Sequence, residues 1–126
     1  MTVTQWTIYI LAFVGLIAFI VMRRRGQISR REAATYVKQG AYVIDVRSPR
    51  EFNTGHLLQA LNVPLDELEG ALPQRIKDKN RVILVHCRSG LRSKQAKARL
   101  QRIGYQNVFD LGSYERAFKI VSGTTL

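Results

Sequence analysis

The residue best suited to covalent chemistry is Cys87, the one cysteine in this chain of 126 residues. A single cysteine excludes an intramolecular disulfide and a site built from several thiolates of one chain. Cys87 follows the apolar run 82–86 and precedes the segment Arg88-Ser89-Gly90-Leu91-Arg92-Ser93. A glycine inside such a segment permits a tight loop, since it adopts positive φ angles at little cost. We therefore expect Cys87 to be a nucleophile, although a lone cysteine more often fills a core.

The predicted surroundings of Cys87 favour a negatively charged sulfur. The residue lies between an expected strand and an expected helix, which is where open parallel α/β sheets bind their ligands. If the loop curls around the sulfur, the backbone N–H groups of residues 88–93 point at it, and the helix N-terminus adds partial positive charge. Arg88 and Arg92 add two full charges that would steer and hold an anionic donor. For each arginine, a solvated surface position is the alternative.

The segments that must position this loop alternate between strand and helix signals. Residues 41–46 and 82–86 are short, rich in β-branched side chains and almost continuously apolar. This pattern is typical of strands buried on both faces of a parallel sheet. Weaker strand signals occur at 61–63 and 108–111. Strands separated by helical segments predict an α/β fold with helices on both faces of the sheet.

The helices are predicted from their starting and ending residues. Ser29 and Ser48 are each followed three residues later by glutamate, which is the pattern of a capping box. Gly40, Gly55 and Gly104 are the expected stops. The segment 66–76 should be helical in two pieces, interrupted by Gly70 and Pro73. The predicted helices are 29–40, 48–55, 66–76, 93–103 and 114–121.

The first 22 residues carry no charged side chain, since all 20 Lys and Arg and all 9 Asp and Glu come later. The apolar run from Val3 gives about 20 residues, or roughly 30 Å of helix, which is enough to cross a bilayer. A cleaved signal peptide would need positive residues before the run, whereas Arg23-Arg24-Arg25 follow it. By the positive-inside rule, these arginines stay in the cytoplasm and the short N-terminus lies outside. A buried helix of a soluble protein is the alternative.

We therefore predict a single-pass protein of the inner (plasma) membrane. Residues 1–26 form a transmembrane anchor, spanning about 4–22, with a basic linker, and 27–126 form one folded domain on the cytoplasmic side. Hydrophobic residues make up 46% and charged residues 23% of the chain, which excludes a disordered tail or a coiled coil. The net charge of +11 is scattered, without a nucleic-acid-binding motif. Anionic lipid head groups are thus a simpler partner than nucleic acid.

Two separated segments resemble the rhodanese sulfurtransferases in their single-domain form. One is Val43-Ile44-Asp45-Val46-Arg47-Ser48-Pro49-Arg50-Glu51-Phe52, which continues through Gly55-His56-Leu57 to Ala60, Asn62 and Pro64. The other is Val85-His86-Cys87-Arg88-Ser89-Gly90-Leu91-Arg92-Ser93. Both occur in the family's order and spacing, and the resemblance extends from Ile28 to about Val121. It implies a three-layer fold with a five-stranded parallel sheet, and a six-residue active-site loop from Cys87 to Arg92.

The resemblance also implies the chemistry of this loop. Cys87 would carry sulfur as a persulfide, taken from a small anionic donor such as thiosulfate and passed to a nucleophilic acceptor, which could be a protein. The substrate-binding residues would be Arg88, Ser89, Gly90, Leu91, Arg92 and Ser93, without a metal or a cofactor. Some phosphatases resemble rhodaneses, but their loop is one residue longer than this one, which has four residues between Cys87 and Arg92. The shorter loop favours a sulfur atom over a phosphoryl group.

Other residues of these segments are interpreted as scaffold. His86 should point away from Cys87, because adjacent side chains of a strand alternate. Arg47 and Glu51 can pair with each other or with Asp45, and a contact of Arg47 or Asp45 with the substrate is the alternative. The resemblance implies that His56 is a buried hydrogen-bonding residue. The chain departs from the family at Leu111-Gly112-Ser113-Tyr114 and Phe118, where a glycine pair and a later tryptophan are usual, although Ser113 can still cap a helix. The alternative function is a non-catalytic membrane-tethered module that recruits or regulates a protein partner.

Overall fold

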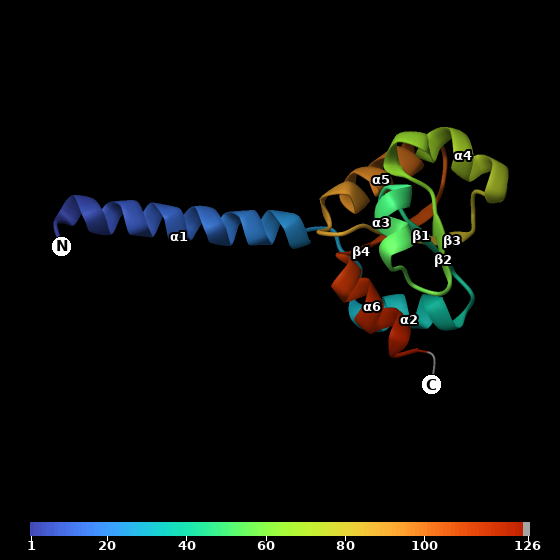
Figure 1. Cartoon of the computed structure of the whole chain (residues 1–126), viewed down its shortest axis with the longest axis horizontal. Helices are drawn as coiled ribbons and strands as arrows, with labels where there is room; N and C mark the ends of the chain where they lie inside the picture. Colours follow the sequence, from blue (N-terminus) through green and yellow to red (C-terminus); the bar gives the residue numbers. More distant parts are fainter. Residues whose placement is uncertain (125–126) are drawn as a thin grey trace.

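The computed structural model of the chain describes residues 1–124, so residues 125–126 of the predicted domain lie outside the described part. The helices and strands alternate after the first helix (Figure 1). In chain order they are α1 (Val3–Arg24), α2 (Arg30–Lys38), β1 (Tyr42–Asp45), α3 (Pro49–Thr54), β2 (Ala60–Asn62), η1 (Leu65–Glu67), α4 (Leu68–Arg75), β3 (Val82–His86), α5 (Leu91–Arg102), β4 (Asn107–Gly112) and α6 (Tyr114–Ser122).

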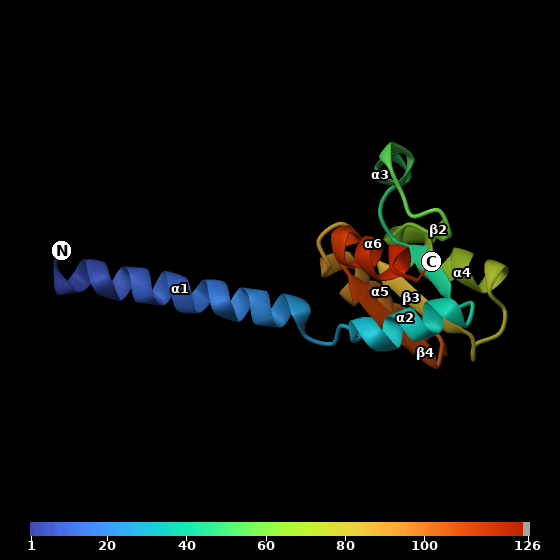
Figure 2. The same cartoon turned by 90° about the horizontal axis from the view of Figure 1, so that it is seen from below.

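Helix α1 extends away from the rest of the chain as a single rod (Figures 1 and 2). Its segment Val3–Met22 has a mean hydropathy of 2.1 and is long and apolar enough to cross a membrane. None of its most apolar window is buried. Large side chains such as Phe13 and Phe19 are more than half exposed. Exposure of this much apolar surface is unfavourable in water, so we expect α1 to lie against an apolar partner or in an apolar environment.

The described residues form a four-stranded, entirely parallel sheet in the order β2-β1-β3-β4. The prediction of five strands is therefore wrong. The place beside β4 where a fifth strand would pair holds one isolated bridge, between Gln27 and Asp110, with a 3.0 Å hydrogen bond from Ile28 N to Asp110 O. The chain turns into α2 directly after this bridge, because Ser29 caps that helix. Too few extended residues remain to form a strand.

Two clusters of buried side chains in the described residues hold helices against the two faces of the sheet. One cluster joins α4 and α5 to the sheet through Leu68, Leu72, Ala96 and Leu100. The other joins α2 and α6 to the opposite face through residues that include Ala33, Ala117 and Ile120. In Figure 1, α4 and α5 lie above the sheet and α2 and α6 below it. This arrangement confirms the predicted α/β fold with covered faces. Neither cluster contains a residue of α1.

The helix starts follow the predicted caps. Ser48 and Glu51 form a reciprocal capping box at α3, with Pro49 in the first turn. The hydroxyl of Ser29 accepts the N–H of Glu32 at 3.3 Å. The expected break within 66–76 lies elsewhere: η1 ends at Glu67, and α4 then contains Pro73 as well as Gly70. Pro73 is the sixth residue of α4 and lacks the N–H that would pair with Glu69 O, and α4 ends two residues later, at Arg75.

Candidate active site

Cys87 lies immediately after β3, and the loop that follows it folds around the sulfur. The backbone N–H of Gly90 donates to Sγ at 3.0 Å and the N–H of Ser93 donates at 3.3 Å. The thiol itself is 3.6 Å from Oγ of Ser93. Hydrogen bonds from N–H groups stabilise negative charge on a sulfur, as they do on an oxyanion. The described loop therefore places two N–H donors where they would stabilise negative charge on Sγ.

A glycine at position 90 is required by the backbone of this loop. Gly90 has φ +97°, in the left-handed region that residues with a Cβ rarely adopt. This conformation turns its N–H toward the sulfur and places its carbonyl where Ser93 Oγ donates to it at 3.2 Å. Ser93 is fully buried and begins the buried face of α5. The loop is thereby held from both of its ends.

The loop also rests on the turn between β4 and α6. Cys87 N donates to Gly112 O at 3.2 Å, and Tyr114 N donates to Arg88 O at 3.2 Å. Gly112 has φ +88°, and a Cβ on it would lie 2.5 Å from Nε2 of Gln27. The side chain of Gln27 therefore packs directly against this turn. The segment before α2 thus supports the loop, although it is too short to form a strand.

Arg92 points its guanidinium at a carboxylate on α3, which follows β1. Its Nη1 and Nη2 donate to Oε1 and Oε2 of Glu51 at 2.6 and 2.9 Å. Mainly because of this hydrogen bonding, the pKa of Glu51 is lowered from 4.5 to about 2. The pair joins α3 to the first turn of α5 at the carboxyl edge of the sheet. An anionic donor would have to compete with Glu51 for Arg92, whereas Arg88 is exposed and forms no ion pair within residues 1–124.

A second ion pair lies beneath the loops, at the end of β1. Asp45 and Arg47 are both buried and are joined by a 2.7 Å contact between Oδ2 and Nη2. Arg47 also donates to Gly55 O at 2.8 Å, which fixes the end of α3. His86 is fully buried, with Nε2 3.8 Å from Asp45 Oδ2, and burial lowers its pKa. These groups hold the strand ends together and do not reach the sulfur through any described contact.

The sequence profile of the rhodanese-like domain matches residues 29–117. The chain belongs to the rhodanese-like domain family. Among curated proteins, it is 38% identical over 69 residues to thiosulfate sulfurtransferase PspE of Escherichia coli. That match covers 55% of this chain and 66% of PspE, slightly less than two thirds of the relative's length.

Solved rhodanese structures have the same fold as this domain. A rhodanese with anions from E. coli matches with a TM-score of 0.59 and 34% identity, over 61% of this chain and 91% of that one. The human single-domain sulfurtransferase TSTD1 matches with a TM-score of 0.65 and 27% identity, over 75% of this chain and 96% of that one. These matches confirm the resemblance that the two sequence motifs indicated.

Two sequence interpretations of the rhodanese-like domain concern its histidines. His86 contacts Asp45 and lies on the Tyr114 side of the sheet, whereas Cys87 belongs to the cluster with α5, so the expected alternation is confirmed. His56 is exposed, so the expectation that it is buried is wrong. The expected hydrogen bond is present, between Nδ1 and Phe52 O at 2.9 Å. His56 follows the end of α3 and stacks on Phe52 with a centroid separation of 3.8 Å. The short α3 projects from the domain (Figure 2), so this ring has no core to enter.

The departures of this rhodanese-like domain in its last segment leave the backbone intact. Ser113 Oγ accepts the N–H of Arg116 at 3.2 Å, so the serine caps α6 as expected. Phe118 is 51% exposed and stacks on Tyr114. The ring of Tyr114 in turn lies under the guanidinium of Arg47, 4.7 Å from its centroid. Tyr114 thus covers the ion pair beneath the loops, and Phe118 packs on Tyr114.

Sequence reasoning missed three contributors to the site. The pair between Glu51 and Arg92 joins residues 41 positions apart, a separation at which sequence spacing carries no signal. No sequence pattern indicated that Gln27 packs against Gly112 either. Asp110 had a signal, since it is an acidic residue near the end of a strand, as Asp45 is. It is buried near Ser93, and burial raises its pKa, opposed by the Ser93 hydroxyl and by the N–H of Gly112.

Proposed function

We propose that the protein is a membrane-anchored sulfurtransferase in which Cys87 carries the transferred sulfur as a persulfide. The observation that carries this proposal is the position of Sγ, which accepts N–H hydrogen bonds from both Gly90 and Ser93. Membership of the rhodanese-like family and similarity to thiosulfate sulfurtransferase PspE and to TSTD1 also support it. The loop has only four residues between Cys87 and Arg92, a length that favours a sulfur atom over a phosphoryl group.

In the first half-reaction, the Cys87 thiolate attacks the outer sulfur of thiosulfate. A bond forms between Sγ and this sulfur, while the bond between the two sulfur atoms of thiosulfate breaks and its electron pair leaves with sulfite. The product is a persulfide whose terminal sulfur carries the negative charge. In this proposal, N–H groups of the loop would stabilise that charge. Arg88 would attract the dianionic donor.

In the second half-reaction, a nucleophile removes the terminal sulfur. With cyanide as the nucleophile, a carbon–sulfur bond forms, the sulfur–sulfur bond breaks, and its electron pair returns to Sγ. Thiocyanate leaves and the Cys87 thiolate is restored, so neither an oxidant nor a reductant is consumed. A protein thiolate could act as acceptor in the same way.

The thiol is fully buried, so access to it must involve movement of the loops. The ion pair between Glu51 and Arg92 links α3 to the active loop and has side chains that are 26% and 35% exposed. It is therefore one of the contacts that opening would break. This burial also favours a second candidate function, a tethered module in which the loop recruits a protein partner without transferring sulfur.

We further propose that α1 anchors the protein in the inner (plasma) membrane with residues 27–126 on the cytoplasmic side. The exposed apolar surface of Val3–Met22 and the arginines that follow it support this placement. If the proposal is correct, alkaline carbonate will not extract the protein from membranes, and protease will digest the domain only from the cytoplasmic face. Release into the soluble fraction would contradict anchoring without affecting the chemistry proposed for Cys87.

Steady-state kinetics test the enzymatic proposal. The fragment 27–126 is suitable, because α1 contributes no residue to either core cluster. Thiocyanate formation from thiosulfate and cyanide should give parallel double-reciprocal lines, as expected when the donor's product leaves before the acceptor binds. Cys87→Ser should abolish turnover while keeping the fold. Intersecting lines, or turnover by the serine variant, would contradict a persulfide on Cys87.

A further inference from the structure

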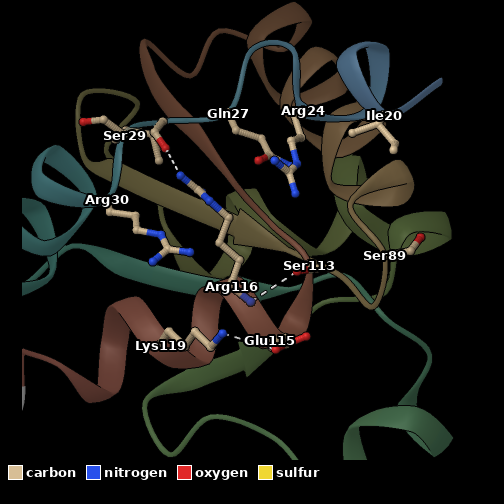
Figure 3. Close-up of a pocket in the computed structure, with 11 residues that line it drawn as sticks. Ile20, Arg24, Gln27, Ser29, Arg30, Ser89, Ser113, Glu115, Arg116 and Lys119 are labelled. Atoms are coloured by element: carbon tan, nitrogen blue, oxygen red, sulfur yellow. Dashed lines mark hydrogen bonds and ion pairs between the residues drawn. The ribbon is translucent and has the colours of Figure 1, made fainter. Parts of the chain in front are cut away.

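A cavity lies at the junction between α1 and the folded domain. It has a volume of about 810 Å³ and is lined on one side by Ile20 and Arg24 of α1. Arg30 at the start of α2 and Arg116 and Lys119 of α6 line the rest of its charged wall. Figure 3 shows the charged ends of these side chains around one open space.

The cavity has more positive charge than its own carboxylate neutralises. Glu115 is the acidic residue among the lining side chains, and it pairs with Lys119 at 3.3 Å. Within residues 1–124, no ion pair includes Arg24, Arg30 or Arg116. Three guanidinium groups therefore share the cavity without a bound carboxylate.

Arg116 is fixed in place at the centre of this cluster. Its guanidinium donates to Leu111 O at 2.7 Å and also to Ile28 O. Burial lowers the pKa of Arg116, and the positive charges of Arg30 and Arg24 lower it further, opposed by the carboxyl group of Asp110. The three groups thus repel one another across the cavity. An anion bound between them would relieve this repulsion.

The position of the cavity indicates where that anion comes from. Ile20 belongs to the apolar segment Val3–Met22, and Arg24 is the last residue of the same helix. If α1 crosses the bilayer, as proposed above, the cavity opens at the level of the lipid head groups. A lipid head group at that level can reach the cavity directly, because the membrane helix forms part of the cavity wall.

We propose that this cavity binds the phosphate of an anionic phospholipid head group, through Arg24, Arg30 and Arg116. The inference rests on the proposed anchoring of α1 but not on sulfur transfer. Binding would fix the domain against the membrane surface. Because Ser89 and Ser113 also line the cavity, the bound head group would lie beside the loop that contains Cys87.

The test uses the full chain in neutral dodecyl maltoside micelles. The thermal shift is followed during titration with dihexanoyl-phosphatidylglycerol, with dihexanoyl-phosphatidylcholine as the uncharged control and inorganic phosphate as the soluble anion. We expect a saturable increase in melting temperature with phosphatidylglycerol and none with phosphatidylcholine. Inorganic phosphate should produce this increase only at concentrations at least about tenfold higher. Equal affinity for phosphate would overturn the head-group assignment in favour of a soluble-anion site, and the absence of a saturable shift would overturn the site itself.

A charge-matched pair of variants separates a built site from diffuse attraction. Arg24→Gln with Arg30→Gln should weaken phosphatidylglycerol binding by about tenfold or more, whereas Arg25→Gln with Arg31→Gln should change it by less than about twofold. Arg25 and Arg31 are exposed neighbours that do not line the cavity. Equal losses in the two double variants would overturn the proposal. Cys87→Ser should show the same thermal shift with phosphatidylglycerol as the wild type. The measurement of lipid binding is therefore independent of sulfur transfer.

Discussion

Replacing Glu51 with glutamine isolates the charge that holds Arg92 against α3. Glutamine at this position keeps an oxygen that can accept the N–H of Ser48, so the capping box survives the change. The two short hydrogen bonds from Arg92, at 2.6 and 2.9 Å, lose their charged acceptor. The variant therefore tests the ion pair and not the helix cap.

The expected loss follows from the pKa of Glu51, which is lowered from 4.5 to about 2 in the folded protein. A lowered pKa means that the folded state favours the carboxylate, so the stabilisation is complete above pH 4.5 and is lost as the pH falls toward 2. The full shift corresponds to a ceiling of about 3 kcal/mol. Because the side chains of Arg92 and Glu51 are 35% and 26% exposed, solvent screening reduces the expected value to about 1 to 2 kcal/mol.

Urea unfolding of residues 27–126 at a series of pH values measures this contribution. The difference in unfolding free energy between the wild type and Glu51→Gln should be about 1 to 2 kcal/mol at pH 7 and should shrink toward zero near pH 2. The buried Asp110 titrates in both proteins, so its effect cancels in the difference. Glu69→Gln is the matched control, because its 3.6 Å contact with Arg99 is longer and its side chain is 42% exposed. The reasoning fails if the Glu51→Gln difference does not depend on pH or if the Glu69→Gln loss equals it.

Two further predictions concern Gly112 and Cys87. Gly112→Ala should reduce the unfolding free energy by about 1 to 2 kcal/mol more than Gly40→Ala. Both glycines have left-handed φ angles, +88° and +86°, but only at Gly112 would a Cβ meet Gln27. Gln27→Ala should recover the excess, and equal losses at the two glycines would show that the amide of Gln27 moves aside freely. Since Cys87 is fully buried, Ellman's reagent should label the native fragment at least about 100-fold more slowly than free cysteine, and a comparable rate would contradict the described burial.

The elements around the loop could be predicted because their signals are local. The run 82–86 gave β3 with the same bounds, and Ser48, Pro49 and Glu51 placed the start of α3 at the correct residue. A glycine within the loop predicts a backbone position with a positive φ angle, and Gly90 has one. Each of these predictions depends on residues within a few positions of one another.

The errors and omissions depend on contacts that sequence spacing does not encode. The fifth strand was expected from the resemblance, but Ser29 starts α2 so early that a single bridge between Gln27 and Asp110 remains. The partner of Arg92 lies on α3, which the parallel pairing of β1 with β3 brings close. Such contacts exist only after the sheet has formed.

The central claim, that Cys87 carries the transferred sulfur, is tested most directly by mass. The wild-type fragment is incubated with thiosulfate, its intact mass is recorded, and cyanide is then added. We predict a gain of one sulfur atom that is lost on addition of cyanide, with stoichiometric thiocyanate, and no gain in Cys87→Ser. If the folded wild type with a free thiol gains no mass from thiosulfate or from other sulfane donors, or if the serine variant gains the same mass, the persulfide account is contradicted.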